Sequence, residues 1–423
     1  MASRTRASGY NGVCDAAVVQ SGLIGRIQES LMAGYGLYVH IPYCETKCGY
    51  CDFYSVPLKD RSTSPVVNRI LAELQERTNS VDGTAPRIRS VFVGGGTPTV
   101  LPLSCLRSLF EALGETLGSS GCEEFTVEAN PATLDDNKLS ILRTAGVDRI
   151  SLGAQSWHPP ELEALERLHS PDDIAPSVAL ARRHGIGRIN LDLIFGIGGQ
   201  TLSSWAESLK KTIDLGVDHV SCYGLTYEPG TRLTAKLHSG RITPCEEGLE
   251  TDMYLLAIET LAEHGYEQYE ISNFAKPGQQ CLQNMIYWRN EPYIGLGPSA
   301  AGYVDGVRYK NVSDIAAYIR MMDADGHAMV ESERVAGPAL AGETMMMQLR
   351  LVDGIDVPAF ISQTRIDPHE AFKSSLARYS SMGLVHVGPE RIALSDRGRL
   401  VADAIISDLY AEVHAATSNR RTA

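Results

Sequence analysis

Several features are scarce in this chain of 423 residues, and each scarcity narrows the range of functions. No apolar run reaches the roughly 20 residues that a membrane-spanning helix needs. Basic residues number 38 against 51 acidic ones, which gives a net charge of −13. Because an acidic chain repels polyphosphate, we expect no nucleic-acid partner, although one or two arginines could still hold a small anion.

Cysteine is also sparse. The chain has nine, an odd number, and six of them are scattered. This is not the dense pattern of a secreted disulfide scaffold, so we expect a cytoplasmic protein. The other three are Cys44, Cys48 and Cys51, and they fall within one short segment, "HIPYCETKCGYCDF". Such a concentration of thiols in one loop predicts a metal or cluster site.

From Gly36 onward, short β-rich runs alternate with segments that carry apolar residues at helical spacing. Six strands are expected, in the runs "GLYVHIP", "SVFVGGG", "EFTVEAN", "RISLGAQS", "RINLDLIFGI" and "HVSCYGLTY". Nearly continuous apolar strands are typical of a sheet that is buried on both faces. Six βα units therefore predict an α/β fold with a parallel sheet and helices outside it, either an open doubly wound sheet or a barrel.

Polar and glycine residues gather where the expected strands end. They are Gly94–Thr97, Glu128, Gln155 and Asp192. In parallel α/β folds this edge of the sheet binds ligands. The glycines alone could simply form a turn. A glutamate, a glutamine and an aspartate at matching strand ends favour a binding site.

The chain changes character after Tyr227. A long helix is expected near Cys245–His264, and from about Pro338 the pattern predicts three helices, a two-stranded wing around "GPER" and a closing helix. This is a winged-helix-like α+β pattern. Residues 361–410 carry six basic and six acidic side chains, so no basic face is present for DNA. A docking or lid role is therefore favoured for this domain.

Three chemistries compete for the cysteine loop. Disulfides are disfavoured by the odd cysteine count and by the expected compartment. Structural zinc needs four ligands, and no second cysteine pair is visible, although His40 could supply the fourth ligand. A [4Fe–4S] cluster has four irons, so three thiolates would leave one iron with an open coordination position. An open position is typical of a metal site that binds a further ligand.

The C-x3-C-x2-C spacing, with Tyr50 before the last cysteine, resembles the radical S-adenosylmethionine (SAM) superfamily. The wider chain is similar to the HemW and oxygen-independent coproporphyrinogen III oxidase family, including its C-terminal module. Eight ordered motifs over about residues 36–300 carry this resemblance: "YVHIPYC", "GGGTPT", "TVEANP", "LGAQS", "NLDLIFGI", "YGLTYEPGT", "YEISNFAKPG" and "YIGLGP". The resemblance implies a partial (β/α)6 radical-SAM barrel that holds a [4Fe–4S] cluster and SAM.

The resemblance also implies a set of site residues. The cluster ligands would be Cys44, Cys48 and Cys51. The SAM-binding residues would be Tyr38, Tyr50, Gly95, Gly96, Thr97, Glu128, Gln155, Arg167 and Asp192. The expected domains are a mobile leader over 1–34, the barrel over 35–300, a connector over 301–336 and the winged-helix-like domain over 337–415.

Each implied SAM contact has a physical reason. The hydroxyl of Tyr38 would reach SAM beside the cluster, and Tyr50 would lie against the adenine. The glycine turn would let backbone N–H groups approach the ligand. Arg167 could pair with a carboxylate. Judged without the family, Arg167 reads more simply as a helix-surface residue, and a capping role is the alternative for Asp192.

Two departures from the family pattern affect the function. Phe53 stands where true oxidases carry another cysteine, which favours the HemW branch, described as haem chaperones. The haem-linked motif H-N-x-x-Y-W, however, reads "QNMIYW" here, with Gln283 in place of histidine. Ala301 likewise stands where many relatives have histidine. An amide is a poorer ligand for haem iron than imidazole, and Cys281 is the best substitute donor in the segment.

Three functions from different classes remain. The favoured one is a HemW-like protein that binds a cluster and SAM and passes haem to an acceptor protein. The second is an enzyme, either a coproporphyrinogen III oxidase or a HemN-like radical SAM methyltransferase, and the change at Gln283 adds weight to it. The third is a non-radical module with structural metal, which leaves Glu128, Gln155 and Asp192 unexplained. Expected ligands and partners are SAM, haem or a porphyrin, and a haem acceptor.

Overall fold

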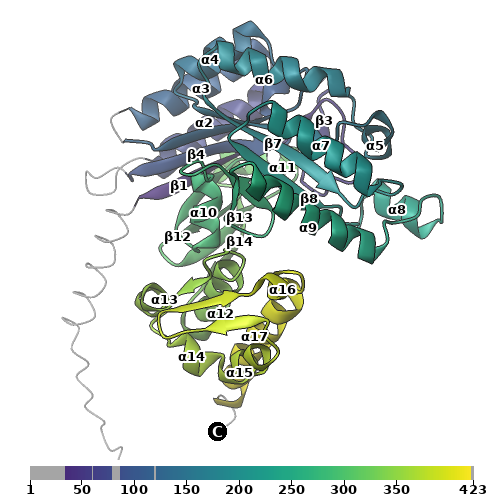
Figure 1. Ribbon diagram of the computed structural model, residues 1–423. Helices are drawn as coiled ribbons and strands as arrows, with labels where there is room; N and C mark the ends of the chain where they lie inside the picture. Colours follow the sequence, from purple (N-terminus) through teal and green to yellow (C-terminus); the bar gives the residue numbers. More distant parts are fainter. Residues whose placement is uncertain (1–33, 60, 79–85, 119–120, 421–423) are drawn as a thin grey trace, which may run out of the picture.

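The computed structural model describes residues 34–59, 61–78, 86–118 and 121–420 (Figure 1). The leader expected over residues 1–34 lies, except for Gly34, outside the described residues. None of the helices within the described ranges has the length and apolar character needed to cross a membrane.

A twelve-stranded sheet forms the centre of the larger part of the molecule. Six of its strands match the runs expected from the sequence: β1 (Tyr35–Ile41), β4 (Ile88–Gly95), β5 (Glu124–Ala129), β6 (Arg149–Gln155), β7 (Arg188–Phe195) and β8 (His219–Gly224). Each of these strands pairs in parallel with the next one along the chain. The predicted α/β class with six βα units is therefore confirmed.

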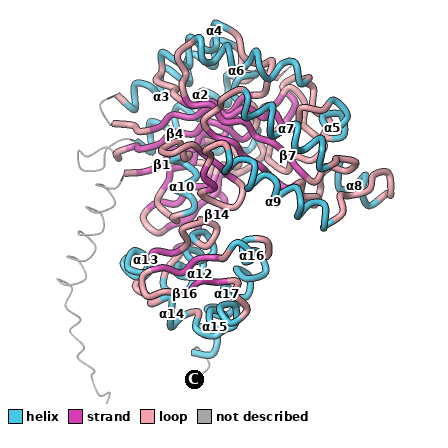
Figure 2. Tube along the Cα trace, in the orientation of Figure 1, coloured by secondary structure: helices cyan, strands magenta, loops and turns pink. Residues whose placement is uncertain are grey.

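Helices follow these strands and cover the sheet (Figure 2). They are α2 (Ser64–Thr78), α3 (Leu103–Leu117), α4 (Asp136–Thr144), α5 (Pro159–Ala164), α6 (Ile174–Arg183), α7 (Leu202–Asp214), α8 (Arg232–His238) and α9 (Glu247–Glu263). The start of α7 shows why a helix begins there. Thr201 and Ser204 form a reciprocal capping box, which satisfies two backbone N–H groups of the first turn.

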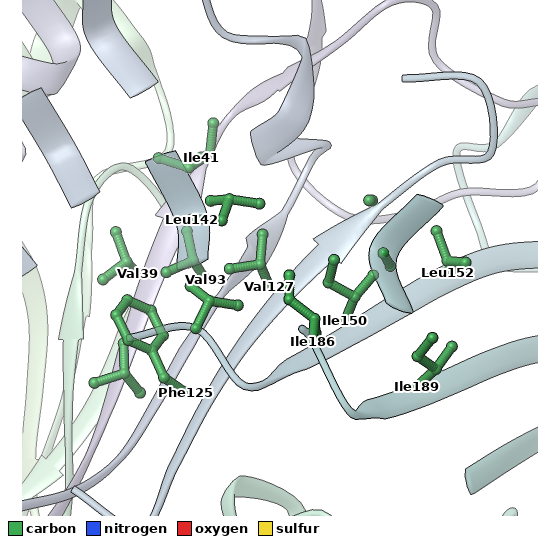
Figure 3. Packing of buried hydrophobic residues seen from close by; sticks show 14 of the residues in the cluster. Val39, Ile41, Val93, Phe125, Val127, Leu142, Ile150, Leu152, Ile186 and Ile189 are labelled. Atoms are coloured by element: carbon green, nitrogen blue, oxygen red, sulfur yellow. The ribbon is translucent and has the colours of Figure 1, made fainter. Parts of the chain in front are cut away.

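Apolar side chains from both faces of the sheet form the main core. All seven residues of β6 are buried, as expected for a strand covered on both sides. Figure 3 shows Val39, Val93 and Val127, one from each of three neighbouring strands, packed in one layer. Because the strands run parallel, their carboxyl ends meet at one edge, and loops after β1, β4, β5, β6 and β7 converge there.

Residues 301–336 are not the connector that the sequence suggested. They supply β12 (Ala301–Val304), β13 (Val307–Asn311), α11 (Ile315–Asp325) and β14 (Met329–Arg334). These strands extend the main sheet beyond β11 (Tyr293–Leu296), which pairs in parallel with β1. The sequence pattern missed them because short antiparallel strands with one exposed face lack a long apolar run. The far edge of the sheet is made by β10 (Asn273–Ala275) and β9 (Glu267–Gln268).

Several short elements lie between these parts of the fold. They are β2 (Tyr43–Cys44), β3 (Val56–Pro57), the 3-10 turns η1 (Pro98–Val100) and η2 (Pro171–Asp173), and α10 (Leu282–Trp288). The pair β2–β3 brackets the cysteine loop. The helix α10 carries the segment "LQNMIYW", which was the haem-linked motif of the sequence.

The C-terminal module has its own core and lies beside the sheet (Figures 1 and 2). Its elements are α12 (Gly337–Gln348), β15 (Ile355–Asp356), α13 (Val357–Thr364), α14 (Pro368–Ala371), α15 (Lys373–Ser381), β16 (Val385–Val387), β17 (Arg391–Leu394), α16 (Asp396–Arg399) and α17 (Ala402–Arg420). The wing expected around "GPER" is the β16–β17 hairpin. A third strand, β15, also joins it, which the sequence did not indicate.

The module is tied to the barrel through backbone as well as side-chain contacts. The backbone N–H of Val352 donates to Tyr269 O at 3.0 Å. The side chain of Asn290 donates to Thr344 at 3.1 Å, and Gln363 donates to the carbonyl of Asn290 at 2.8 Å. These bonds place α12 next to α10.

Candidate functional site

A cavity of about 550 Å³ opens at the carboxyl edge of the parallel strands, beneath the cysteine loop. Its walls include eleven of the twelve residues proposed from the sequence: Cys44, Cys48, Tyr50, Cys51, Gly95, Gly96, Thr97, Glu128, Gln155, Arg167 and Asp192. These residues come from six separate segments of the chain. The edge rule for parallel sheets accounts for their convergence.

The three cysteines are half-buried and line this cavity together. Each sulfur has a polar neighbour. Thr97 Oγ1 donates to Cys44 Sγ at 3.7 Å, Arg167 Nη1 donates to Cys48 Sγ at 3.5 Å, and the backbone of Phe53 hydrogen-bonds Cys51. Burial raises the pKa of the Cys44 thiol, and it raises the pKa of Cys51 to about 11. All eight cysteines in the described ranges are free.

This donor set fits a cluster better than a single ion. Within the described ranges, no three histidine, cysteine or carboxylate side chains converge closely enough to hold one metal ion. His40, the candidate fourth zinc ligand, has Nε2 at 2.8 Å from Tyr54 O and Nδ1 at 2.9 Å from the Tyr38 hydroxyl. Its two nitrogens are therefore engaged away from the cysteines. Three thiols on one loop above an open cavity match a cluster with one exchangeable corner.

The glycine turn is shaped by packing within the chain. A Cβ on Gly96 would lie 2.4 Å from Tyr43 O, and one on Gly95 would lie 2.3 Å from His40 Nδ1. The N–H groups of Gly96 and Thr97 donate to Ile41 O and Tyr43 O, at 2.8 and 2.7 Å. The expectation that these N–H groups face the ligand is thus not met. The turn instead holds the start of the cysteine loop against β4.

Two carboxylates face the cavity from β5 and β7. Asp192 accepts from Asn190 Nδ2 at 2.8 Å and from Ser151 Oγ at 3.1 Å, and Glu128 accepts from the N–H of Gly95 at 2.9 Å. Burial raises the pKa of both, and the neighbouring charge of Asp192 contributes to the pKa of Glu128, which is about 8. Two acids this close favour a ligand that brings a positive charge or several donors.

Arg167 is fixed inside the cavity wall. Its Nη2 donates to Asn130 Oδ1 and to Gly153 O, each at 2.6 Å. The simple interpretation of Arg167 as a helix-surface residue is therefore wrong, because α5 ends at Ala164 and the chain turns inward. The buried Nε has no partner in the described residues and is free to meet an anionic group.

Gln155 has a backbone φ of 64°, a left-handed conformation that non-glycine residues rarely adopt. The register between β6 and β7 shifts just before it, between Leu152 and Gln155. Such a bulge re-aims a side chain at the end of a strand. Strained backbone of this kind is often kept at binding sites.

Tyr38 is the one proposed residue that lies outside the lining of this cavity. Its hydroxyl is bonded to His40, and it lines a second cavity instead. The ring of Phe92, which does line the first cavity, packs against Tyr38 with 6.3 Å between the ring centroids. Sequence reasoning also missed Asn130, which donates to Thr97 at 3.0 Å. Its place directly after β5 was the available signal.

The second cavity, of about 680 Å³, lies between the barrel and the C-terminal module. Its aromatic walls are Tyr38, Phe53, Tyr54, Tyr223, Tyr287, Trp288 and Tyr293. Lys310 from β13 and Arg350, just after α12, add two cations, and Met347 adds a thioether. Asp52 and Glu270 add two carboxylates. Four residues line both cavities, namely Asp52, Phe53, Tyr223 and Asn284. The two cavities are therefore neighbours that share a wall.

The three residues that the sequence singled out for haem binding, Gln283, Cys281 and Ala301, fall in different places. Gln283 is fully buried and lines neither cavity, and its amide lies 2.8 Å from where a Cβ on Gly36 would be. Cys281 lies in the wall of the first cavity and donates to Glu124 at 3.3 Å, and burial raises the pKa of its thiol. A neutral thiol bonded to a carboxylate is a poor candidate for an iron ligand. Ala301 does line the second cavity.

Comparison with known proteins agrees with this geometry. The radical SAM superfamily model matches residues 38–212, and the HemN C-terminal domain model matches residues 337–401. The protein named "Heme chaperone HemW" from Bacillus subtilis is 35% identical over 378 residues, covering 89% of this chain and 99% of that protein. The protein of that name from Lactococcus lactis is 31% identical over 361 residues, covering 85% of this chain and 93% of that protein.

Among solved structures, coproporphyrinogen III oxidase (HemN) from Escherichia coli, a radical SAM enzyme, matches with a TM-score of 0.78. The match covers 92% of this chain and 93% of that protein at 21% identity, so it shows the shared fold. The predicted radical-SAM barrel with a C-terminal module is confirmed. Together with the HemW relatives, these matches establish that the chain belongs to the HemW family of radical SAM proteins.

Proposed function

We propose that Cys44, Cys48 and Cys51 hold a [4Fe–4S] cluster and that SAM occupies the rest of the first cavity. Support comes from the three half-buried thiols of one loop above a cavity whose walls include Glu128, Asp192 and the fixed Arg167. A cluster of this class supplies one-electron reduction of the SAM sulfonium group when it is bound. Membership of the radical SAM superfamily implies both cofactors.

The residues of the chain would then bind and orient SAM. Glu128 and Asp192 accept from its amino or hydroxyl donors, and Arg167 offers its unpartnered Nε to an anionic group. Tyr50, which lines the first cavity, would cover the adenine. Gln155, held by the bulge at the end of β6, would offer its side-chain amide to SAM as a further hydrogen-bonding group. Each of these roles is a proposal for the residue concerned.

We further propose that the protein is a haem chaperone, as the name of its relatives states for them. The observation that carries this is the second cavity, which has seven aromatic rings among its nineteen lining residues and presents Lys310 and Arg350. Aromatic rings suit the flat face of a porphyrin. The two cations suit its carboxylates. Haem would pass from here to an acceptor protein in the cytoplasm, without nucleic acid.

A second function is favoured by a specific observation. Asp52, Phe53, Tyr223 and Asn284 line both cavities, so a porphyrinogen in the second cavity would sit next to SAM in the first. That arrangement suits a radical SAM enzyme acting on a porphyrinogen, or a radical SAM methyltransferase. In that case the four residues of the shared wall would position the substrate beside SAM.

One experiment separates the two functions. The full-length protein is reconstituted anaerobically with iron and sulfide and then supplied with SAM, haem or coproporphyrinogen. A chaperone binds haem with a defined stoichiometry and releases it to an apo-acceptor, with no 5′-deoxyadenosine produced in step with transfer. An enzyme forms 5′-deoxyadenosine in proportion to altered porphyrinogen. Failure to bind haem and to form 5′-deoxyadenosine would refute both functions.

A further inference from the structure

The cysteine loop is held from outside by α8. The backbone N–H of Leu233 donates to Gly49 O at 2.8 Å, and Arg232 Nη2 donates to Lys47 O at 2.5 Å. These two carbonyls flank Cys48 on either side. Figure 1 shows α8 next to α5 at this end of the barrel. The loop backbone is therefore fixed at the two residues around its middle cysteine.

Glu166 joins the same elements together. Its carboxylate pairs with Lys236 Nζ at 2.7 Å and with Arg232, both on α8. A Cβ on Gly49 would lie 2.9 Å from the carboxyl carbon of Glu166, so the carboxylate packs directly on the loop backbone. The hydrogen bond from Lys236, together with Arg232, lowers the pKa of Glu166, which keeps the group charged.

Glu166 holds this place at a conformational cost. Its φ is 57°, in the left-handed region that side chains other than glycine rarely adopt. Partly exposed ion pairs contribute little to stability by themselves. Glu166 is strained, and its ion pairs stabilise the fold little. Its presence is therefore better explained by the segment that it positions, which is the cysteine loop.

An apolar cluster supports the same contact. Leu165, the residue before Glu166, packs with Leu233 of α8 in a small core separate from the main one. Tyr50 of the cysteine loop packs against this core. Arg167 donates to Cys48 Sγ and Glu166 packs on Gly49, so two consecutive residues touch the loop beside the small core that holds Leu165. The end of α5 and α8 thus form one clamp around the loop.

We propose that Glu166 is a positioning residue that ties α8 to the cysteine loop and keeps residues 47–49 in the shape that receives the cluster. This inference rests on the proposed placement of the cluster on Cys44, Cys48 and Cys51. With the clamp intact, the loop keeps its shape when it is empty and releases iron slowly when it is loaded. Without it, the cysteines remain but their loop loosens.

Glu166→Gly is the most informative variant, because glycine adopts a left-handed φ freely and removes the carboxylate at the same time. The melting temperature of the cluster-free protein should therefore stay the same or rise. Iron loss to a ferrous chelator, followed anaerobically by cluster absorbance, should be roughly 3- to 10-fold faster, as expected for the loss of two ion pairs and a packing contact. Arg232→Met should also accelerate it.

Lys210→Met serves as the matched control, since Lys210 forms an exposed ion pair with Asp214 on α7, away from the loop. It should leave iron loss unchanged. Equal release rates in the wild type, Glu166→Gly and Arg232→Met would overturn the proposal.

A second readout does not require the cluster. Amide hydrogen exchange of Leu233 in the cluster-free protein reports the bond to Gly49 O directly. Glu166→Gly should speed this exchange, and unchanged exchange would overturn the clamp. If the wild type takes up no cluster at all, the proposed function fails instead, and the exchange experiment still decides on Glu166.

Discussion

The guanidinium of Arg167 donates a 2.6 Å hydrogen bond to Asn130, and Asn130 in turn donates to Thr97 at 3.0 Å. One line of contacts therefore joins the loop after α5, the strand end of β5 and the glycine turn after β4. This line fixes the only arginine that the first cavity offers close to the cysteine sulfurs within the described residues.

Arg167→Lys tests this relationship. A lysine keeps the charge but cannot reach Asn130, Gly153 and Cys48 together, because its ammonium is a point donor rather than a planar fork. We expect SAM affinity of the cluster-loaded protein to fall by about 1–3 kcal/mol, measured by equilibrium binding. Arg182→Lys is the control, since Arg182 donates to the carbonyls of Leu215 and Gly216 on the surface and does not line the first cavity. Equal losses in both variants would argue against a specific role.

Cysteine replacements should divide into two classes. Cys44→Ala, Cys48→Ala and Cys51→Ala should each lose most of the cluster iron, because each removes one corner ligand. Cys105→Ala and Cys222→Ala should keep it, since both are buried thiols outside the lining of the first cavity. The measurement is iron and sulfide content after anaerobic reconstitution. Full iron retention in Cys48→Ala would contradict the ligand assignment.

Gly96→Val should disturb more than SAM binding. The new side chain would collide with the carbonyls of Tyr43 and Ile41, which are backbone atoms that cannot move without shifting the start of the cysteine loop. We expect both cluster content and SAM affinity to drop sharply. Gly187→Ala, where a Cβ meets nothing within 4 Å, is the control. Normal cluster content with normal SAM binding in Gly96→Val would show that the turn is not needed.

Glu128 should give the cluster-free protein a characteristic pH dependence. Its pKa is raised to about 8, above that of an unfolded glutamate, because of burial and of nearby Asp192. The folded state therefore binds an extra proton between about pH 4.5 and 8. This contribution to stability is complete below that range and is lost as the pH rises through about 8.

Chemical denaturation at pH 6 and pH 9 tests this dependence. The wild type should lose roughly 2–3 kcal/mol more stability than Glu128→Gln over this interval, because its folded state keeps about one extra proton until the pH reaches about 8. Glutamine stays neutral and can still accept from the N–H of Gly95. The comparison with the variant cancels other titrating groups. If the free energy of unfolding falls by the same amount in both proteins between pH 6 and pH 9, Glu128 is already ionised at pH 6.

Gln283→His should not create a haem ligand. Position 283 is fully buried against Gly36 and lines neither cavity, so an imidazole there cannot reach the second cavity. We expect unchanged haem affinity and no histidine-type absorption spectrum. Ala301→His, at a position that does line the second cavity, should produce that spectrum. A histidine-type spectrum in Gln283→His alone would place the haem elsewhere.

Much of the first cavity could be predicted from the sequence, because each strand that leads to it is buried and reads as an apolar run. The end of such a run marks the binding edge, which located Glu128, Gln155 and Asp192 without any structure. The cysteine spacing located the loop. The same rule would also have found Asn130, directly after β5.

The second cavity could not be predicted in this way. Its walls come from β1, α10, β13 and the end of α12, which are far apart along the chain and brought together by docking of the C-terminal module. The cavity that Tyr38 lines could not be predicted either. Alternation along a strand shows which face of the sheet a side chain lies on, but it cannot show which of two neighbouring cavities the side chain enters. The strands over 301–334 were missed because they are short and partly exposed.

The docking of α12 against α10 has a thermodynamic consequence for the second cavity. Met347 and Arg350 contribute to its wall only while the module is docked. Any molecule that binds both walls must favour the docked arrangement, and by reciprocity anything that favours undocking must weaken that molecule's binding by the same factor. A protein that grips the C-terminal module could therefore draw the bound molecule out of the cavity without ever entering it.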